Sequence, residues 1–146
     1  SSDLTTEHLD ELLPRADFVA LSLPNSPATY HIMDERRLRL MKKTAFLLNV
    51  GRGSAIDPEA LNRVLHDGWL GGCGVDVTEP EPLPEDSPLW DAPRMYITTQ
   101  ISGQYHLQET FERIVRIAGG NLEKFLAGEK DSMKNLVDFK TGYRRR

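Results

Sequence analysis

Arg52 is placed between two glycines, Gly51 and Gly53, directly after an apolar stretch of the sequence. This arrangement superficially resembles a glycine-rich loop that binds a dinucleotide phosphate. The pattern fails because Ile56 occupies the position of the third glycine, and because an arginine in the turn would crowd a phosphate. The glycines instead allow a sharp turn that presents the guanidinium, whose planar fork can donate two hydrogen bonds to a carboxylate. Arg52 is therefore a candidate for binding an acidic ligand, with a surface ion pair as the alternative.

Two carboxylates each have a structural and a functional interpretation. Asp76 ends an apolar stretch, and a buried carboxylate is costly unless it accepts hydrogen bonds. It acts either as a structural cap or as a ligand contact, and the sequence leaves both open. Glu81 lies in the segment Glu-Pro-Glu-Pro, where a solvated charge is the ordinary role. A functional role for Glu81 requires a partner, such as a base whose protonated form it stabilises.

The histidines and the cysteine give no independent sign of catalysis. His8 and His66 fall on helix positions expected to be exposed, His31 follows a turn, and His106 begins the last predicted helix. No Cys/His spacing fits a metal site, and no serine lies in a nucleophile-elbow pattern. Cys73, in the segment Gly-Gly-Cys-Gly, is expected to be a small buried thiol rather than a reactive one.

Composition places the chain among ordinary globular proteins. Of its 146 residues, 39% are hydrophobic and 27% are charged, a balance unlike that of disordered or membrane proteins. The formal net charge of −4 gives no field that favours nucleic acid or an anionic membrane surface. The longest apolar runs, 18–23 and 45–48, are far shorter than the roughly 20 residues of a membrane-spanning helix. The lone cysteine and the lack of a signal-peptide pattern favour a cytoplasmic location.

The apolar pattern predicts strands that alternate with helices. The predicted strands are near-continuous apolar runs, typical of strands buried on both faces, at 18–23, 44–50, 72–77 and 95–98. Asp34 and Asp57 are expected to be helix N-caps, the second followed by Pro58 at the favoured first helical position. A short helix is expected before Pro14, and the longest should span about 107–126. The residues of this helix expected to face inward are Phe111, Ile114, Ile117, Ala118, Leu122 and Phe125.

This order of elements predicts an α/β fold with a mostly parallel sheet and flanking helices. In such sheets ligands bind beyond the carboxyl ends of the strands. The loops after the four strands should therefore gather along one edge. These loops contain Pro24, Arg52, Glu79, Glu81 and Gln100.

Taken together, these segments resemble the D-isomer-specific 2-hydroxyacid dehydrogenase family. Asn49–Gly53 matches the Asn-x-x-Arg-Gly signature of that family, and Glu81-Pro82-Leu83 matches its Glu-Pro-Leu segment. The further similar segments are 16–24, 29–32, 74–77 and 135–138. The resemblance covers nearly all of the chain. It implies a partial Rossmann-type parallel sheet with flanking helices that ends in a long C-terminal helix.

The resemblance also implies roles for individual residues. Arg52 would hold the substrate carboxylate and the 2-oxo group, and Glu81 would pair with a catalytic histidine that donates a proton. Asp76 would contact the nicotinamide end of NAD or NADP, and hydride would move between the cofactor and carbon 2 of a small 2-oxo or 2-hydroxy acid. Further cofactor contacts would fall on Leu23, Pro24, Val50 and Gly51.

The resemblance further implies how the chain is divided. Residues 1–126 would be the C-terminal portion of the NAD(P)-binding domain, without its glycine-rich phosphate loop. Residues 127–146 would return toward a substrate domain. Because family members are longer, the chain is expected to be a fragment that binds cofactor poorly by itself. The full-length protein is expected to be a homodimer.

Gln100 departs from the family pattern. The catalytic histidine of the family lies in a Thr-Pro-His segment after the last strand, and here the matching run is Thr98-Thr99-Gln100. A neutral amide can donate a hydrogen bond but cannot deliver a proton near pH 7, and losing a general acid typically costs about 10²–10⁴ in rate. His106, six residues later, is an alternative donor, although a position inside the following helix disfavours that geometry. The sequence predicts an NAD(P)-dependent oxidoreductase, or alternatively a non-catalytic dinucleotide- or partner-binding member.

Overall fold

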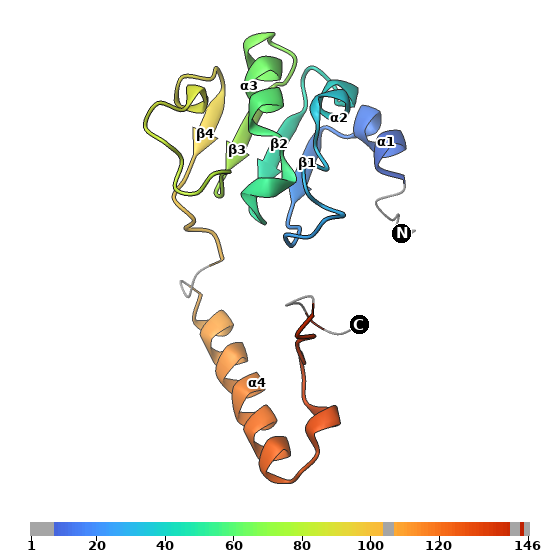
Figure 1. Cartoon of the computed structure of the whole chain (residues 1–146), viewed down its shortest axis with the longest axis vertical. Coiled ribbons are helices and arrows are strands. Elements are labelled where there is room, and N and C mark those ends of the chain that lie inside the picture. Colours follow the sequence, from blue (N-terminus) through green and yellow to red (C-terminus); the bar gives the residue numbers. More distant parts are fainter. Residues whose placement is uncertain (1–7, 104–106, 141–143, 145–146) are drawn as a thin grey trace. The chain divides into compact units, whose positions relative to one another are not determined.

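The computed structural model describes residues 8–103, 107–140 and 144, and its first part is built on a four-stranded parallel sheet (Figure 1). The strands are β1 (Phe18–Leu21), β2 (Phe46–Asn49), β3 (Gly72–Val75) and β4 (Met95–Ile97). They lie side by side in sequence order, and every neighbouring pair is parallel. The carboxyl ends of all four strands therefore lie along one edge, which confirms the predicted parallel α/β fold.

The helices begin where their caps predict. Helix α2 (Glu35–Leu40) starts after Asp34, whose side chain accepts a hydrogen bond from the backbone N of Arg37 at 2.8 Å. Helix α3 (Pro58–His66) starts after Asp57, which accepts from two backbone N–H groups of the first turn at 3.0 Å. Each cap satisfies a donor that has no partner within its helix.

Helix α1 (Leu9–Leu12) is the shortest, because the chain passes at Leu13 into a tighter turn that contains Pro14. Proline has no backbone N–H and cannot continue the hydrogen-bonding pattern of an α-helix. Short 3-10 turns lie at Leu13–Arg15, Gly53–Ala55, Pro88–Trp90 and Lys130–Ser132. None of the described helices is long and apolar enough to cross a membrane.

The core lies between one face of the sheet and the first three helices. Its buried residues include Leu21, Leu47, Cys73 and Val75 from the strands, and Leu13, Leu38, Leu61, Val64 and Leu65 from the helical segments. Cys73 is 1% exposed, and burial raises the pKa of its thiol to about 12. The prediction of a small buried thiol is therefore confirmed.

The opposite face of the sheet corrects one prediction. Phe18 and Tyr96 are each 71% exposed, and the rings of Phe18 and Phe46 stack on this face with 5.8 Å between their centroids. The strands were expected to be buried on both faces. Within the described part of residues 1–102, the helices contribute their apolar side chains to one face only, so exposed and buried residues alternate along β2.

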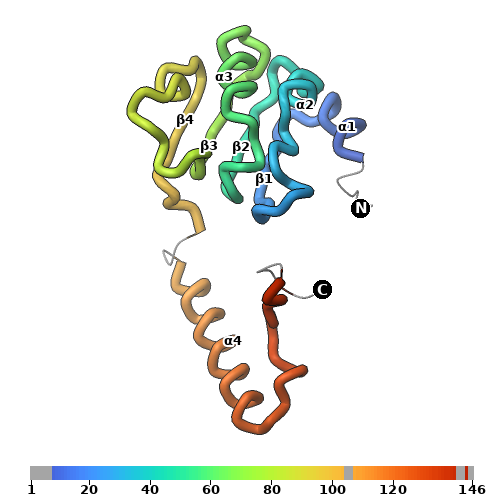
Figure 2. Tube along the Cα trace, in the orientation of Figure 1, coloured from blue at the N-terminus to red at the C-terminus, as the bar shows by residue number. Residues whose placement is uncertain are grey.

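Residues 103–146 form a second compact unit built on helix α4 (Gln108–Leu126). The expected inward-facing residues of this helix are instead mostly exposed, including Phe111 (56%), Leu122 (59%) and Phe125 (51%), because the described part of the unit offers no sheet or second long helix to cover them. The segment after α4 runs back along the helix (Figure 2). Asn121 holds it there, since its side-chain amide donates to the carbonyl O of Lys134 at 2.8 Å and accepts from the N of Lys134 at 2.7 Å.

Candidate functional site

The Gly51–Gly53 loop after β2 is wedged between the loops that follow β1 and β3. A Cβ added to Gly51 would lie 2.5 Å from the backbone N of Leu23, and one added to Gly53 would lie 1.9 Å from the carbonyl O of Thr78. Neither distance can accommodate a side chain. The two glycines are therefore required by close backbone approach, and the sharp turn that the sequence predicts is present.

Asn49, the last residue of β2, fixes the shape of this loop. It is fully buried at the end of β2, its side-chain Nδ2 donates to the carbonyl O of Arg52 at 2.9 Å, and its Oδ1 accepts from the N of Gly51 at 3.1 Å. A buried amide is costly unless it is hydrogen-bonded, and here both ends of the amide are used. Asn49 thus spans the turn and holds Arg52 at its tip.

Arg52 is exposed at the carboxyl edge of the sheet. Its Nη1 donates to the carbonyl O of Gly51 at 2.9 Å. The guanidinium of arginine has five N–H groups, and this bond uses one of them. The other N–H groups can be directed at a ligand. The position therefore suits a residue that binds a carboxylate.

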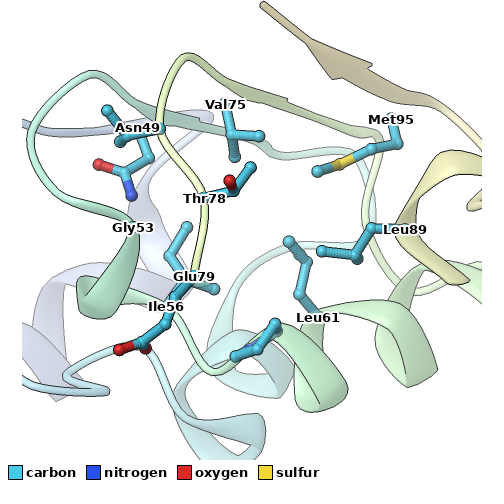
Figure 3. A pocket seen from close by; sticks show the side chains of 11 residues that line it. Asn49, Gly53, Ile56, Leu61, Val75, Thr78, Glu79, Leu89 and Met95 are labelled. Carbon is cyan, nitrogen blue, oxygen red and sulfur yellow. The ribbon is translucent and has the colours of Figure 1, made fainter. Parts of the chain in front are cut away.

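A small cavity lies behind the loop (Figure 3). Asn49 and the Gly53 turn lie on one side of it, and Met95 and Leu89 lie on the other. Its volume is about 20 Å³ and most of its lining is apolar. The loop is therefore supported by packed side chains rather than by solvent.

Asp76 follows β3 and caps the loop that follows β4. Its Oδ1 accepts hydrogen bonds from the hydroxyl of Thr98 and from the N of Ile101 at 2.9 Å. Its Oδ2 accepts from the N and the Oγ of Ser102, at 2.8 and 2.5 Å. An ionised carboxylate accepts about four hydrogen bonds, so this acceptor capacity is filled. These hydrogen bonds show the structural cap, and the contact of Asp76 with a cofactor stays a prediction.

The environment of Asp76 keeps it ionised. The side chain is 5% exposed, and burial alone would raise its pKa. The hydrogen bonds from Ser102 and Thr98, and those from the backbone of Ile101 and Ser102, outweigh this effect and hold the pKa of Asp76 well below its usual range. At neutral pH a negative charge therefore stands beneath the loop that carries Gln100.

Glu81 and Gln100 line one pocket, together with Asp76. The backbone N of Gln100 donates to the carbonyl O of Asp76 at 2.9 Å, and Gln100 adopts a left-handed conformation with φ 52°. The pocket has a volume of about 230 Å³, and Trp90, Pro82 and Leu83 supply much of its apolar wall. Two of the three predicted catalytic residues are thus brought together. Arg52 is not among the residues that line this pocket and lies at the tip of the neighbouring loop.

The residues expected to contact a cofactor form a strip along the ends of β1 and β2. Gly51 is buried, Leu23 is half-buried, and Pro24 and Val50 are exposed. The backbone N of Val50 donates to the carbonyl O of Leu21 at 2.9 Å, which continues the pairing of the two strands beyond their ends. The strip is an apolar surface at the edge where parallel sheets bind ligands.

Two features of the site were missed by sequence reasoning. One is the role of Asn49, for which a lone amide at the end of an apolar strand was the available signal. The other is a contact of 2.9 Å between Nε2 of His31 and Oε2 of Glu79, residues far apart in the sequence. His106, considered as a replacement proton donor, lies outside the described residues. The described residues contain no group of three potential metal ligands.

The sequence matches a family model described as the NAD binding domain of D-isomer specific 2-hydroxyacid dehydrogenases, over residues 1–102. It is 40% identical over 121 residues to a glyoxylate reductase of Korarchaeum cryptofilum, covering 83% of this chain and 36% of that protein. It is also 40% identical over 121 residues to a glyoxylate/hydroxypyruvate reductase B of Pectobacterium carotovorum, covering 83% of this chain and 37% of that protein.

Solved structures give the same result. A D-isomer specific 2-hydroxyacid dehydrogenase from Xanthobacter autotrophicus, in complex with NADPH and MES, superposes with a TM-score of 0.81 at 31% identity, over 94% of this chain and 54% of that one. The TT0316 protein from Thermus thermophilus superposes with a TM-score of 0.71 at 42% identity, over 86% of this chain and 39% of that one. The chain spans little more than a third of the length of the curated relatives. From its sequence match and its fold, the chain belongs to the D-isomer specific 2-hydroxyacid dehydrogenase family.

Proposed function

We propose that this chain forms part of an NAD(P)-dependent reductase that interconverts a small 2-oxo acid and the corresponding 2-hydroxy acid. The observation that carries the proposal is the presentation of Arg52, held by Asn49 and exposed at the carboxyl edge of the sheet. The printed names of the relatives, which are glyoxylate and hydroxypyruvate reductases, support a small acidic substrate. Arg52 binds the substrate carboxylate through paired, charge-assisted hydrogen bonds.

The strip formed by Leu23, Pro24, Val50 and Gly51 fits one end of a dinucleotide cofactor. The exposed side chains of Pro24 and Val50 offer an apolar surface on which a flat ring can lie, and Gly51 lets the two strand-end segments of the strip pack together. When bound, reduced cofactor supplies hydride to carbon 2 of the substrate. Asp76 would contact the nicotinamide end of the cofactor, and its hydrogen bonds also shape the loop that carries Gln100.

Gln100 determines how the reaction obtains its proton. Hydride addition at carbon 2 moves the carbonyl electron pair onto oxygen, and that oxygen then takes a proton. The Gln100 amide can donate a hydrogen bond to the oxygen but has no proton to give, so the proton comes from water. We therefore expect turnover that is slow for this reaction, with Glu81 lining the same pocket but lacking the histidine partner that the family provides.

The remaining proposals concern the whole protein. Residues 1–126 form the C-terminal portion of an NAD(P)-binding domain, and residues 127–146 return toward a substrate domain. The protein acts in the cytoplasm as a homodimer. By itself the chain binds cofactor weakly, because it carries no glycine-rich phosphate loop of the kind that holds a pyrophosphate.

The test uses the protein as its gene encodes it, with glyoxylate or hydroxypyruvate and either reduced cofactor. Loss of reduced-cofactor absorbance should follow addition of the 2-oxo acid. Arg52→Gln should raise the KM for the acid by about 10- to 100-fold, because a bidentate charged contact is lost. Arg63→Gln is the matched control, since Arg63 of α3 pairs with Glu35 of α2. If millimolar NADH and NADPH leave the fluorescence of the reduced cofactor unchanged, the proposal fails.

A second candidate is a non-catalytic member that binds a dinucleotide or a partner. The feature in its favour is the run Thr98-Thr99-Gln100, in which Gln100 stands where the resemblance places the catalytic histidine of the family. A protein of this kind would bind reduced cofactor but would show no turnover, either as it stands or after Gln100→His.

A further inference from the structure

His31 contacts two of the loops at the carboxyl edge of the sheet. Its backbone N donates to the carbonyl O of Ser54 at 2.7 Å, next to the Gly51–Gly53 loop. Its ring Nε2 lies 2.9 Å from Oε2 of Glu79, two residues before Glu81. His31 itself belongs to the segment after β1. One residue therefore joins the segments that follow three neighbouring strands.

The backbone and ring of His31 are both held in place. Its φ is 46°, in the left-handed region, which costs conformational energy even for histidine, one of the residues with a Cβ that adopt this region most often. The ring of Tyr30 stacks on the imidazole with 4.0 Å between centroids and 13° between planes. The hydrogen bond to Ser54 holds the backbone, while the stack and the contact with Glu79 hold the ring. A strained residue maintained by contacts on both sides is a feature of sites whose geometry matters.

The contact between His31 and Glu79 is partly shielded from water. The two side chains are 28% and 33% exposed, so their hydrogen bond is screened less than one on the open surface. The Gly53 backbone already packs against Thr78 and Glu79. The ring of His31 adds a side-chain contact to the same loop, at Glu79. The proposed reaction assigns no role to His31.

We propose that His31 is a positioning residue that fixes the Arg52 loop relative to the loop that carries Glu81. The inference rests on the proposed function, in which the Arg52 loop binds the substrate carboxylate and Glu81 lies in the neighbouring pocket. Displacing a substrate-binding group by about 1 Å can cost on the order of 10²-fold in rate. A link between the two loops would therefore affect turnover more than cofactor binding.

Two substitutions separate the ring contact from the backbone contact. His31→Gln places an amide N–H near the position of Nε2 and can keep the hydrogen bond to Glu79. His31→Leu removes that bond at a similar side-chain size. Both variants must adopt the same left-handed φ and both keep the backbone N–H to Ser54, so they differ mainly in the Glu79 contact. His66→Leu is the matched control, because His66 is exposed on α3 and its ring contacts the carbonyl O of Asn62.

The experiment compares these variants by amide hydrogen exchange and by steady-state kinetics with glyoxylate. In His31→Leu, exchange should accelerate by about tenfold in residues 52–55 and 78–81, and kcat/KM for glyoxylate should fall by about tenfold, with the Kd for reduced cofactor changed by less than about twofold. His31→Gln should restore both quantities. His66→Leu should match the wild type.

Several results would overturn the inference. Unchanged exchange in the two segments of His31→Leu would show that the ring does not join the loops. Faster exchange with an unchanged kcat/KM would show that the link does not serve the reaction. If the wild type lacks turnover altogether, the proposed function fails, and hydrogen exchange alone then decides whether His31 holds the loops together.

Discussion

Asp76 binds both hydrogen-bond donors of Ser102. Its Oδ2 accepts from the backbone N of Ser102 at 2.8 Å and from the Oγ of Ser102 at 2.5 Å. The other oxygen holds Thr98 and Ile101. A single side chain at the end of β3 thus shapes the loop after β4, with Gln100 at its centre. These hydrogen bonds hold residues on both sides of Gln100, which itself adopts a left-handed conformation.

The low pKa of Asp76 predicts a specific loss of stability in acid. Because the pKa is lower in the folded than in the unfolded chain, the stabilisation is fully present above about pH 4 and is lost as the pH falls toward the folded value. Asp10 and Glu35, whose pKa values arginine partners also lower, contribute to the same fall in the wild type. Urea unfolding at pH 6 and at pH 3 measures the total.

Asp76→Asn isolates the part that belongs to Asp76. At pH 6 the variant should be less stable by about 1–3 kcal/mol. The side-chain NH2 of the new asparagine replaces one carboxylate oxygen, so the donors that bonded to this oxygen lose their acceptor. The gap between wild type and variant should narrow at pH 3. A gap of equal size at both pH values would contradict the assignment.

Gly53→Ala should destabilise the protein by about 1–3 kcal/mol, because the new methyl group cannot fit against the carbonyl O of Thr78 and the backbone must move. The matched control is Gly119→Ala in α4, where a Cβ meets no atom within 4 Å. That change should stabilise the helix by up to about 1 kcal/mol, because alanine has the higher helix propensity. Urea midpoints of the two variants give the comparison. Similar midpoints would refute the close-approach account.

Gln100→His should raise kcat for glyoxylate by about 10²–10⁴-fold, since it supplies a proton donor to the pocket that Glu81 lines. Histidine is among the residues that tolerate a left-handed backbone, so the φ of 52° is compatible with the change. Gln100→Asn serves as control, because it also tolerates this backbone and supplies no proton. Turnover equal in both variants would argue that Gln100 does not stand at the proton-donor position.

Cys73 should resist alkylation in the folded protein. Burial raises its thiol pKa to about 12, and only the thiolate reacts. Against a free thiol with a pKa of about 8.5, the native rate at neutral pH should be lower by roughly a thousandfold. Maleimide labelling with and without urea measures the difference. Rapid labelling without urea would mean that β3 is exposed in solution.

The sequence was sufficient for elements whose signals are local. Asp34, Asp57 and Pro58 predicted the starts of α2 and α3, and alternation of strands with helices predicted the parallel sheet. Such features depend on residues within a few positions of each other. Boundaries were less accurate, since β2 ends at Asn49 rather than at Val50.

Features that depend on distant partners could not be predicted in this way. An apolar run shows that Phe18 or Phe125 favours burial, but it does not show which segment covers the side chain, and both are exposed. The capping role of Asp76 could be recognised only by seeing Thr98, Ile101 and Ser102 around it. The His31–Glu79 contact joins loops after different strands, and no spacing within the sequence indicates it.

The Gly51–Gly53 loop has a consequence for how this protein could change over evolution. Backbone packing excludes any side chain at Gly51 and Gly53, while the side chain of Arg52 is exposed and contacts the backbone through one hydrogen bond. Arg52 contributes its carbonyl O, common to every residue, to the bond with Asn49. The scaffold therefore tolerates substitution at Arg52, the residue proposed to bind the substrate carboxylate. The proposal then implies that a single codon change can alter the substrate charge preference without remodelling the loop.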